Sequence, residues 1–197
     1  MISLYKKFCS VQYLILIFIV FLSFAISIFK SIYNTDPHHF SFLFFDAYQI
    51  SKGAIPYSEI NILYGIVTTI IHYLSILVLG NYVLSISVVT GFLYALTFLF
   101  YYFILINIGL DKNYSLFIIL LIFLIHPGIL TPWSNYIAYF FLILGIFFFT
   151  LSNKDNRNFF FLGLFLGLAT LSRQTFFFST FLFVIFINFI HAIIEIF

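Results

Sequence analysis

The chain has 197 residues, of which 64% are hydrophobic and 7% are charged, whereas roughly a quarter are charged in a typical globular domain. With a mean hydropathy of +1.19, this composition argues against an ordinary water-soluble domain and predicts an all-α integral membrane protein. The net charge of +2 is too small to indicate a nucleic-acid partner, and the single cysteine excludes an internal disulfide.

The chain begins with two lysines, Lys6 and Lys7, and an apolar run from Val11 to Phe29. This run is longer than a signal-peptide core of roughly 7–15 residues, and no cleavage site follows it. It predicts a first membrane span with the N-terminus in the cytoplasm. Because the sequence stops inside another apolar pattern, we expect it to be the N-terminal portion of a longer protein.

Seven apolar runs are candidate spans: Val11–Phe29, Ile62–Leu79, Tyr82–Ile108, Ser115–Ile125, Asn135–Leu151, Phe159–Leu171 and Thr175–Ile194. If all seven crossed the bilayer, three basic residues would face the cytoplasm and five would lie outside, which opposes the positive-inside rule. If Ile62–Leu79 does not cross, the count becomes five inside and three outside. The inner five are then Lys6, Lys7, Lys112, Lys154 and Arg157, and the outer three are Lys30, Lys52 and Arg173.

The pattern within Ile62–Leu79 favours that second arrangement. Its small and polar residues share one helical face: Gly65, Thr68, Thr69, His72 and Ser75. A two-faced helix is typical of a segment at the membrane surface. We expect His72 to be a hydrogen-bonded packing residue rather than a catalytic one.

A second two-faced helix is predicted over His39–Ser51. Its apolar stripe consists of Phe40, Leu43, Phe44, Ala47 and Ile50. Asp46 lies on the polar side, where we expect it to be solvated. The predicted architecture is therefore a multi-pass transmembrane helical bundle of about six spans, with two juxtamembrane helices in a first outer loop of about residues 30–81. We expect the whole of 1–197 to form one membrane-embedded module. Asp36 and Arg173 should lie outside, and the Asn153–Asn158 loop should be cytoplasmic.

The stretch "DPHH", Asp36–His39, is the main polar cluster in this apolar chain. Asp36 before Pro37 is typical of a helix N-cap, and its carboxylate is equally a candidate general base at the membrane surface. His38 and His39 are candidates for hydrogen bonding to a substrate. Because adjacent histidines on a helix point about 100° apart, we predict no metal site here.

Arg173 is a basic residue on the predicted outer side, against the orientation rule. A guanidinium pairs well with phosphate, so Arg173 is a candidate phosphate ligand. A snorkelling arginine at the interface is the alternative interpretation.

Four motifs in order resemble bacterial members of the GT-C glycosyltransferases, the superfamily that includes protein O-mannosyltransferases and lipid A aminoarabinose transferases. They are "DPHH" (Asp36–His39), "G..PY......YG" (Gly53–Gly65), "PW" (Pro132–Trp133) and "GL..L.RQ" (Gly167–Gln174). The resemblance implies sugar transfer from a polyprenyl-phosphate carrier to a lipid, glycan or protein acceptor, in a bacterial inner membrane, on its outer face. It implies Asp36 as the catalytic residue, and we assign His38, His39, Tyr64, Arg173 and Gln174 to substrate binding.

Two departures from the family matter. Phe40 stands where related sequences often carry an acidic residue, which supports the prediction of no metal and no cofactor. Members also run to several hundred residues. Two other classes remain open: a lipid flippase or polysaccharide transport protein, which charges inside the spans would favour, and a non-catalytic membrane protein in which Asp36 only caps a helix.

Overall fold

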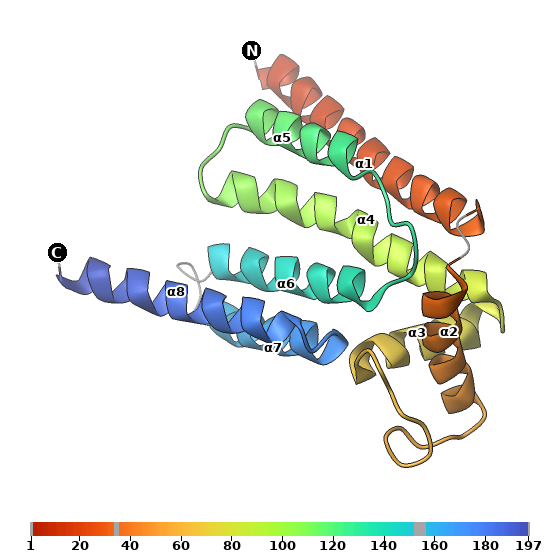
Figure 1. The fold of residues 1–197 in the computed structure, drawn as a ribbon. Helices are drawn as coiled ribbons and strands as arrows, with labels where there is room; N and C mark the ends of the chain where they lie inside the picture. Colours follow the sequence, from red (N-terminus) through yellow and green to blue (C-terminus); the bar gives the residue numbers. More distant parts are fainter. Residues whose placement is uncertain (1, 34–35, 152–156, 197) are drawn as a thin grey trace.

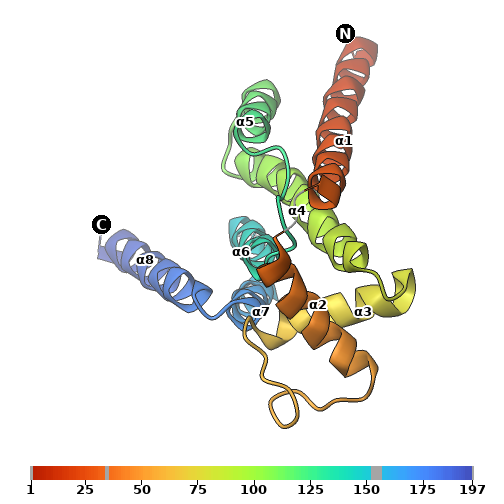
Figure 2. The same cartoon turned by 45° about the vertical axis from the view of Figure 1, so that its right-hand side comes forward.

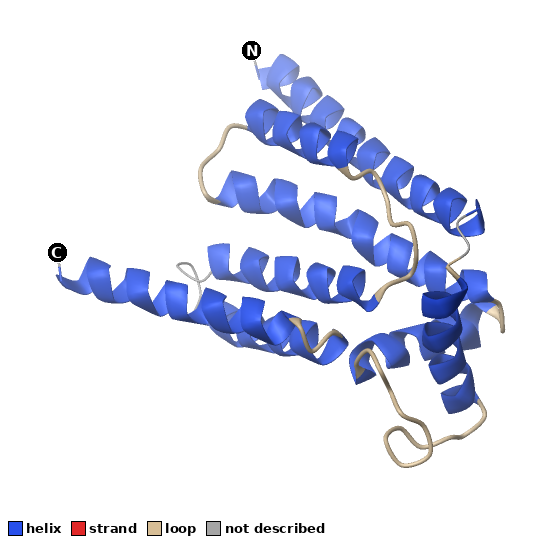
Figure 3. Ribbon diagram, viewed as in Figure 1, coloured by secondary structure: helices blue, strands red, loops and turns tan. Residues whose placement is uncertain are grey.

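The computed structural model describes residues 2–33, 36–151 and 157–196. The described residues form eight α-helices and no β-strand (Figure 3), which confirms the all-α prediction for this part of the chain. The helices are α1 Ile2–Tyr33, α2 Pro37–Ser51, α3 Ile66–Leu79, α4 Val83–Asn107, α5 Lys112–Ile125, α6 Ser134–Thr150, α7 Arg157–Ser172 and α8 Phe176–Ile196. The predicted Asn153–Asn158 loop lies mostly outside the described residues.

Six helices, namely α1 and α4 to α8, run back and forth, and α2 and α3 lie together at one end of them (Figures 1 and 2). Both chain termini lie toward the opposite end (Figure 1). Val11–Tyr33 within α1 and Val83–Asn107 of α4 are long and apolar enough to cross a membrane. The helices α5, α6 and α7 are apolar but shorter, with 14, 17 and 16 residues.

The helix boundaries follow the apolar runs of the sequence closely. Two helices differ from their runs: α1 is longer, beginning at Ile2 rather than Val11, and α3 begins at Ile66 rather than Ile62. Gly65 adopts a φ of +123°, a conformation that glycine tolerates and other residues rarely adopt, and it separates the preceding loop from the helix. α2 begins at Pro37, because Asp36 caps it and proline suits the first helical position.

The core of the bundle lies where α1, α4 and α5 meet, around Leu16, Phe98 and Ile119. Close approach at its edge depends on two glycines, since a Cβ on Gly91 or Gly128 would lie within 2.9 Å of Ser27. The Ser27 hydroxyl donates to the carbonyl of Ser23 and accepts from the Ile129 amide at 3.1 Å. These contacts fix α1 and the α5–α6 connection against the bundle.

α3 carries its polar face toward the protein and its apolar face outward. Thr68 and His72 are fully buried, whereas the side chain of Val78 is 81% exposed and that of Leu77 57% exposed. The two predicted faces are confirmed, and His72 is a buried packing residue as expected. An exposed apolar face of this kind marks a surface that meets a membrane or another protein segment.

α2 buries the predicted apolar stripe at Phe40, Leu43 and Ala47. The prediction that Asp46 is solvated is wrong, because its side chain is only 5% exposed. The Asp46 carboxylate accepts a hydrogen bond from the backbone of Leu63, which belongs to the loop before α3. That loop folds over the face of α2 that we expected to meet water.

Candidate functional site

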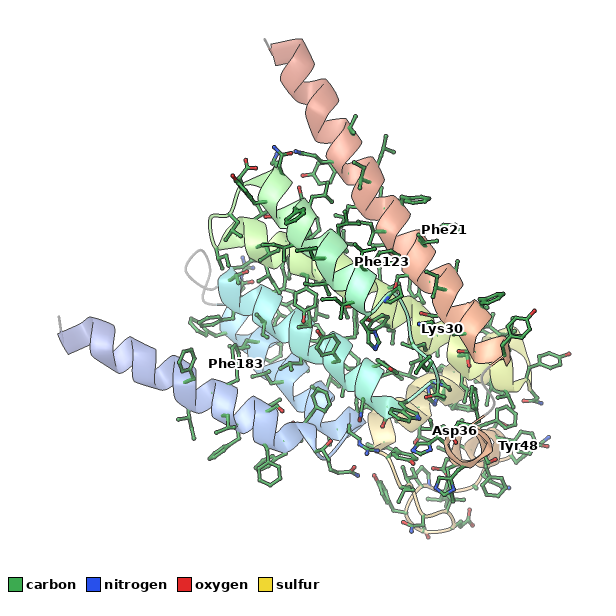
Figure 4. The ribbon with its side chains drawn as sticks, turned by 45° about the horizontal axis from the view of Figure 1, so that its top comes forward. Phe21, Lys30, Asp36, Tyr48, Phe123 and Phe183 are labelled. Carbon is green, nitrogen blue, oxygen red and sulfur yellow. The ribbon has the colours of Figure 1, made fainter. Side chains whose placement is uncertain are left out.

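Asp36 combines the two properties that the sequence left open. It is the N-cap of α2, and its Oδ1 accepts from the backbone N–H of His39 at 3.3 Å. Its side chain is also 32% exposed, so the carboxylate remains accessible from outside. Asp36 lies beside α2, at the end of the bundle away from Phe183 (Figure 4).

His39 connects Asp36 to the rest of the site. Its Nδ1 lies 3.2 Å from Oδ2 of Asp36, an ion-pair distance when the imidazole is protonated, although the approach is not along a hydrogen-bond direction. The imidazole also packs between two aromatic rings, with centroids 4.9 Å from Trp133 and 6.0 Å from Tyr64. His38, in contrast, is exposed and contacts Phe42 edge-on.

Arg173 completes this group of side chains. The carbon of its guanidinium lies 4.7 Å from the centroid of the Tyr64 ring, which is a cation–π contact. Its Nη1 donates to the Ser134 hydroxyl at 3.4 Å. Residues from α2, the loop before α3, the start of α6 and the end of α7 therefore converge, although they lie far apart in the sequence.

The local backbone explains how Arg173 reaches Tyr64. Gly65 follows Tyr64 and approaches the end of α7 so closely that a Cβ there would lie 2.5 Å from the carbonyl oxygen of Ser172. The Thr68 hydroxyl donates to the same oxygen at 2.9 Å, which satisfies a carbonyl that the helix end leaves free. The "YG" and "RQ" motifs of the sequence are thus parts of one contact.

These side chains enclose a small pocket of about 180 Å³, lined by His39, Leu43, Tyr64, Trp133, Ser134, Asn135 and Arg173. Trp133, one of the lining residues, has a buried indole Nε1–H without an acceptor. α6 begins at Ser134 with no side-chain cap, so its N-terminal amide groups add positive potential. A guanidinium, an unused N–H donor and a helix N-terminus together suit a small anion.

A larger cavity of about 740 Å³, which shares no lining residue with this pocket, has Asp36 in its wall. Its lining is mainly apolar and comes from the end of α1, from α2 and from the start of α4. The carboxylate of Asp36 therefore faces a hydrophobic cavity, and Arg173 lines the smaller polar pocket.

The structure brings together Asp36, His39, Tyr64 and Arg173 of the predicted site. Gln174 is exposed and lines a third cavity with Tyr57 and Phe177, away from the Arg173 pocket. Sequence reasoning missed Trp133 and Ser134 as members of the site. The signal was the "PW" motif, which carried part of the family resemblance but was given no role in the site.

Burial changes the pKa of two groups beside the site. Burial raises the pKa of Asp46 to about 6, partly opposed by the hydrogen bond from the Leu63 backbone. Burial lowers the pKa of His72 to about 3, so this imidazole is neutral at pH 7. Its Nε2 lies 2.9 Å from the Thr90 hydroxyl, which already donates to the Ile86 carbonyl, so Nε2 carries the proton.

Among the described residues, no three His, Cys, Asp or Glu side chains gather as a metal site requires. The prediction that the protein needs no metal remains a prediction. Comparison with protein-family models, with curated protein sequences and with solved structures found no match to this chain.

Proposed function

We propose that this protein is a membrane glycosyltransferase that moves a sugar from a polyprenyl-phosphate carrier to an acceptor hydroxyl, on the outer face of the membrane in which it lies. The observation that carries the proposal is that the accessible carboxylate of Asp36 contacts His39, and that His39 in turn lines the pocket suited to an anion. Asp36 is the general base, and the Arg173 pocket receives the phosphate of the carrier.

The membrane part of the proposal is that α1 and α4 to α8 are six spans, with α2 and α3 at the outer surface. The distribution of charge supports it. One group of charged residues belongs to the segments around α2, α3 and the end of α7: Lys30, Asp36, Asp46, Lys52, Glu59 and Arg173. A second group lies just before or at the start of α5 and α7, at the other end (Figure 1): Asp111, Lys112 and Arg157. The helical segments between these two groups carry large exposed apolar side chains. With Lys6, Lys7 and Lys154 added by their positions in the sequence, five basic residues belong to the end with the N-terminus and three to the end with α2 and α3, so the positive-inside rule favours a cytoplasmic N-terminus.

In the proposed reaction, the acceptor hydroxyl gives its proton to the Asp36 carboxylate while its oxygen forms a bond to the anomeric carbon. The bond from that carbon to the phosphate oxygen breaks, and the phosphate leaves with the electron pair from the opposite face, so the configuration inverts. Arg173, the Trp133 Nε1–H and the N-terminus of α6 stabilise the charge that develops on the phosphate. His39 holds the carboxylate in position from one side.

Two other functions must be separated from this one. Charged residues inside the spans would favour a flippase or polysaccharide transporter. The helices α4, α5 and α6 argue against it, because their only charged residue is Lys112, the first residue of α5. A non-catalytic role is favoured by the capping bond of Asp36, which by itself accounts for an aspartate at this position.

The substitution Asp36→Asn separates catalysis from capping. Asparagine caps a helix about as well as aspartate but is not a base. We expect sugar transfer from a polyprenyl-phosphate donor to fall by roughly 10²–10⁴ in the protein expressed from its complete reading frame, with unchanged membrane insertion and thermal stability.

Asp111→Asn is a matched control. Asp111 is the N-cap of α5, its carboxylate accepts from the Asn113 amide at 2.8 Å, and it lies at the other end of the bundle (Figure 1). This variant should retain normal transfer. Near-normal transfer by Asp36→Asn would show that Asp36 is only a cap.

A further inference from the structure

The large cavity beside Asp36 has a lining that is unusual for a site of sugar chemistry. It is formed by Ser31, Ile32, Asp36, Phe40, Ser41, Phe42, Phe44, Phe45, Val83, Leu84 and Ser87. Seven of these eleven residues are apolar, and four of the seven are phenylalanines. Its volume of about 740 Å³ is within the roughly 300–1,000 Å³ range of pockets that enclose a small molecule.

Two residues that line this cavity have hydroxyl groups without a partner in the structure. Ser87 is fully buried and Ser31 is 9% exposed, and neither side-chain oxygen makes a hydrogen bond. Other buried hydroxyls, such as those of Thr68, Thr90 and Ser75, are hydrogen-bonded, although that of Ser23, outside this cavity, is not. Because buried polar groups normally have partners, unsatisfied hydroxyls that line a cavity indicate a ligand with a polar group at that point.

The two observations define the chemistry of the ligand. It has an aliphatic or otherwise apolar body, which fills the phenylalanine-lined part of the cavity, and a few hydrogen-bonding oxygens. A peptide does not fit this lining, since each residue brings an N–H and a C=O that require partners when buried. A free sugar has even more polar groups to satisfy. An amphiphile from the membrane fits both parts.

We propose that this cavity binds the acceptor, and that the acceptor is a membrane lipid with a free hydroxyl group. Asp36 lines this cavity, whereas Arg173 lines the smaller pocket beyond His39, so the base faces the lipid and the phosphate lies on the other side. Ser31 and Ser87 bind oxygens of the lipid head and orient its hydroxyl toward Asp36. The role as acceptor rests on the proposed function, but binding of the lipid does not.

Photolabelling tests the binding step alone. The probe is a diacylglycerol with a diazirine in one acyl chain, and its methyl ether, which lacks the free hydroxyl, is the matched probe. In vesicles of phosphatidylcholine we expect the diacylglycerol to label peptides that contain residues 31–45 and 83–87. The double variant Ser31→Ala/Ser87→Ala should reduce labelling about tenfold, as expected for the loss of two hydrogen bonds.

Ser23→Ala is the matched protein control. Ser23 is also on α1 and fully buried, and its hydroxyl has no hydrogen-bond partner, but it does not line this cavity, so loss of that hydroxyl should leave labelling unchanged. Any of three results would overturn the proposal: the methyl ether labels equally well, Ser23→Ala reduces labelling as much as the double variant does, or polyprenyl phosphate displaces the probe. The last result would assign the cavity to the sugar donor.

A transfer assay then separates the two proposals. With a radiolabelled polyprenyl-phosphate sugar, we expect a new chloroform-soluble product, distinct from the donor, that forms from the diacylglycerol and fails to form in Asp36→Asn. If the probe labels the cavity but sugar transfer survives Asp36→Asn, the assignment of Asp36 as the base is wrong and the lipid site stands. Asp36-dependent transfer that goes only to protein would remove the lipid acceptor and keep the proposed base.

Discussion

The guanidinium of Arg173 is held in one orientation by the ring of Tyr64 and the hydroxyl of Ser134. A planar cation stacked on an aromatic ring keeps its remaining N–H groups free for an anion in the same plane. Lysine carries the same charge but has neither the planar donor group nor the stacking surface. These contacts support the proposal that Arg173 is a phosphate ligand rather than a basic residue that only reaches toward the membrane surface.

Arg173→Lys should lower sugar transfer about tenfold to a hundredfold, the effect expected for losing charge-assisted hydrogen bonds to a phosphate. Steady-state kinetics with a polyprenyl-phosphate donor would measure it. Gln174→Ala is the neighbouring control, because Gln174 is exposed and lines a separate cavity. Full activity in Arg173→Lys, or an equal loss in Gln174→Ala, would contradict the assignment of Arg173.

Asp46 is a buried carboxyl group whose pKa is raised by burial to about 6. Between its ordinary value of 3.8 and about 6, the folded protein binds more protons than the unfolded chain, so stability from this group falls as the pH rises through that window. Asp46→Asn removes this penalty and retains an oxygen that can accept from the Leu63 backbone. At pH 7 the variant should be more stable by up to about 2–3 kcal/mol, and near pH 4 the difference should vanish.

Thermal unfolding of both purified proteins across pH 4–8 would measure this difference. His72, with a pKa lowered to about 3, makes both proteins less stable as the pH falls below its ordinary 6.5, so the comparison cancels its effect. A variant that is less stable than the parent at pH 7 would show that the charged carboxylate stabilises the loop over α2.

At the scale of helices, the site depends on how α3 meets α7. The carbonyls of Leu171 and Ser172 lie so near Gly65 that a Cβ on Gly65 would be 2.6 Å and 2.5 Å from their oxygens. Thr68 on the next turn donates to Ser172. This contact sets the distance between Tyr64, just before α3, and Arg173, just after α7.

Gly65→Ala should destabilise the protein by about 2–4 kcal/mol, because it adds a steric clash with backbone to an unfavourable φ. Gly53→Ala isolates the second effect, since Gly53 has a φ of +94° and a methyl group at this position would meet no other atom within 4 Å. The control should lose only about 1–2 kcal/mol. Equal melting temperatures for the two variants would mean that α3 and α7 separate easily.

The helices were predictable because long apolar runs, a Pro37 start and the turn residues near Pro132 mark their ends locally. The cap at Asp36 was predictable for the same reason. The environment of Asp46 was not, because it depends on a loop that folds back over α2. The contact of His39 with Trp133 joins residues 94 positions apart, so no local pattern announces it.

At the scale of the whole molecule, the charged residues of the described part of the chain belong to segments at the two ends of a set of helices that expose large apolar side chains. α3 presents Leu77 and Val78 outward, so even the end that carries the site has an apolar flank. The central claim is that six helices cross a membrane and hold Asp36 and Arg173 at its outer surface.

Cysteine accessibility in intact cells tests this claim most directly. In a Cys9→Ser background, single cysteines are introduced as Ser58→Cys, in the exposed loop between α2 and α3, and as Asn153→Cys, in the α6–α7 connection. A membrane-impermeant maleimide should label the first variant and should label the second only after the membrane is opened. Labelling of Asn153→Cys from outside intact cells would contradict the six-span arrangement and the placement of the site.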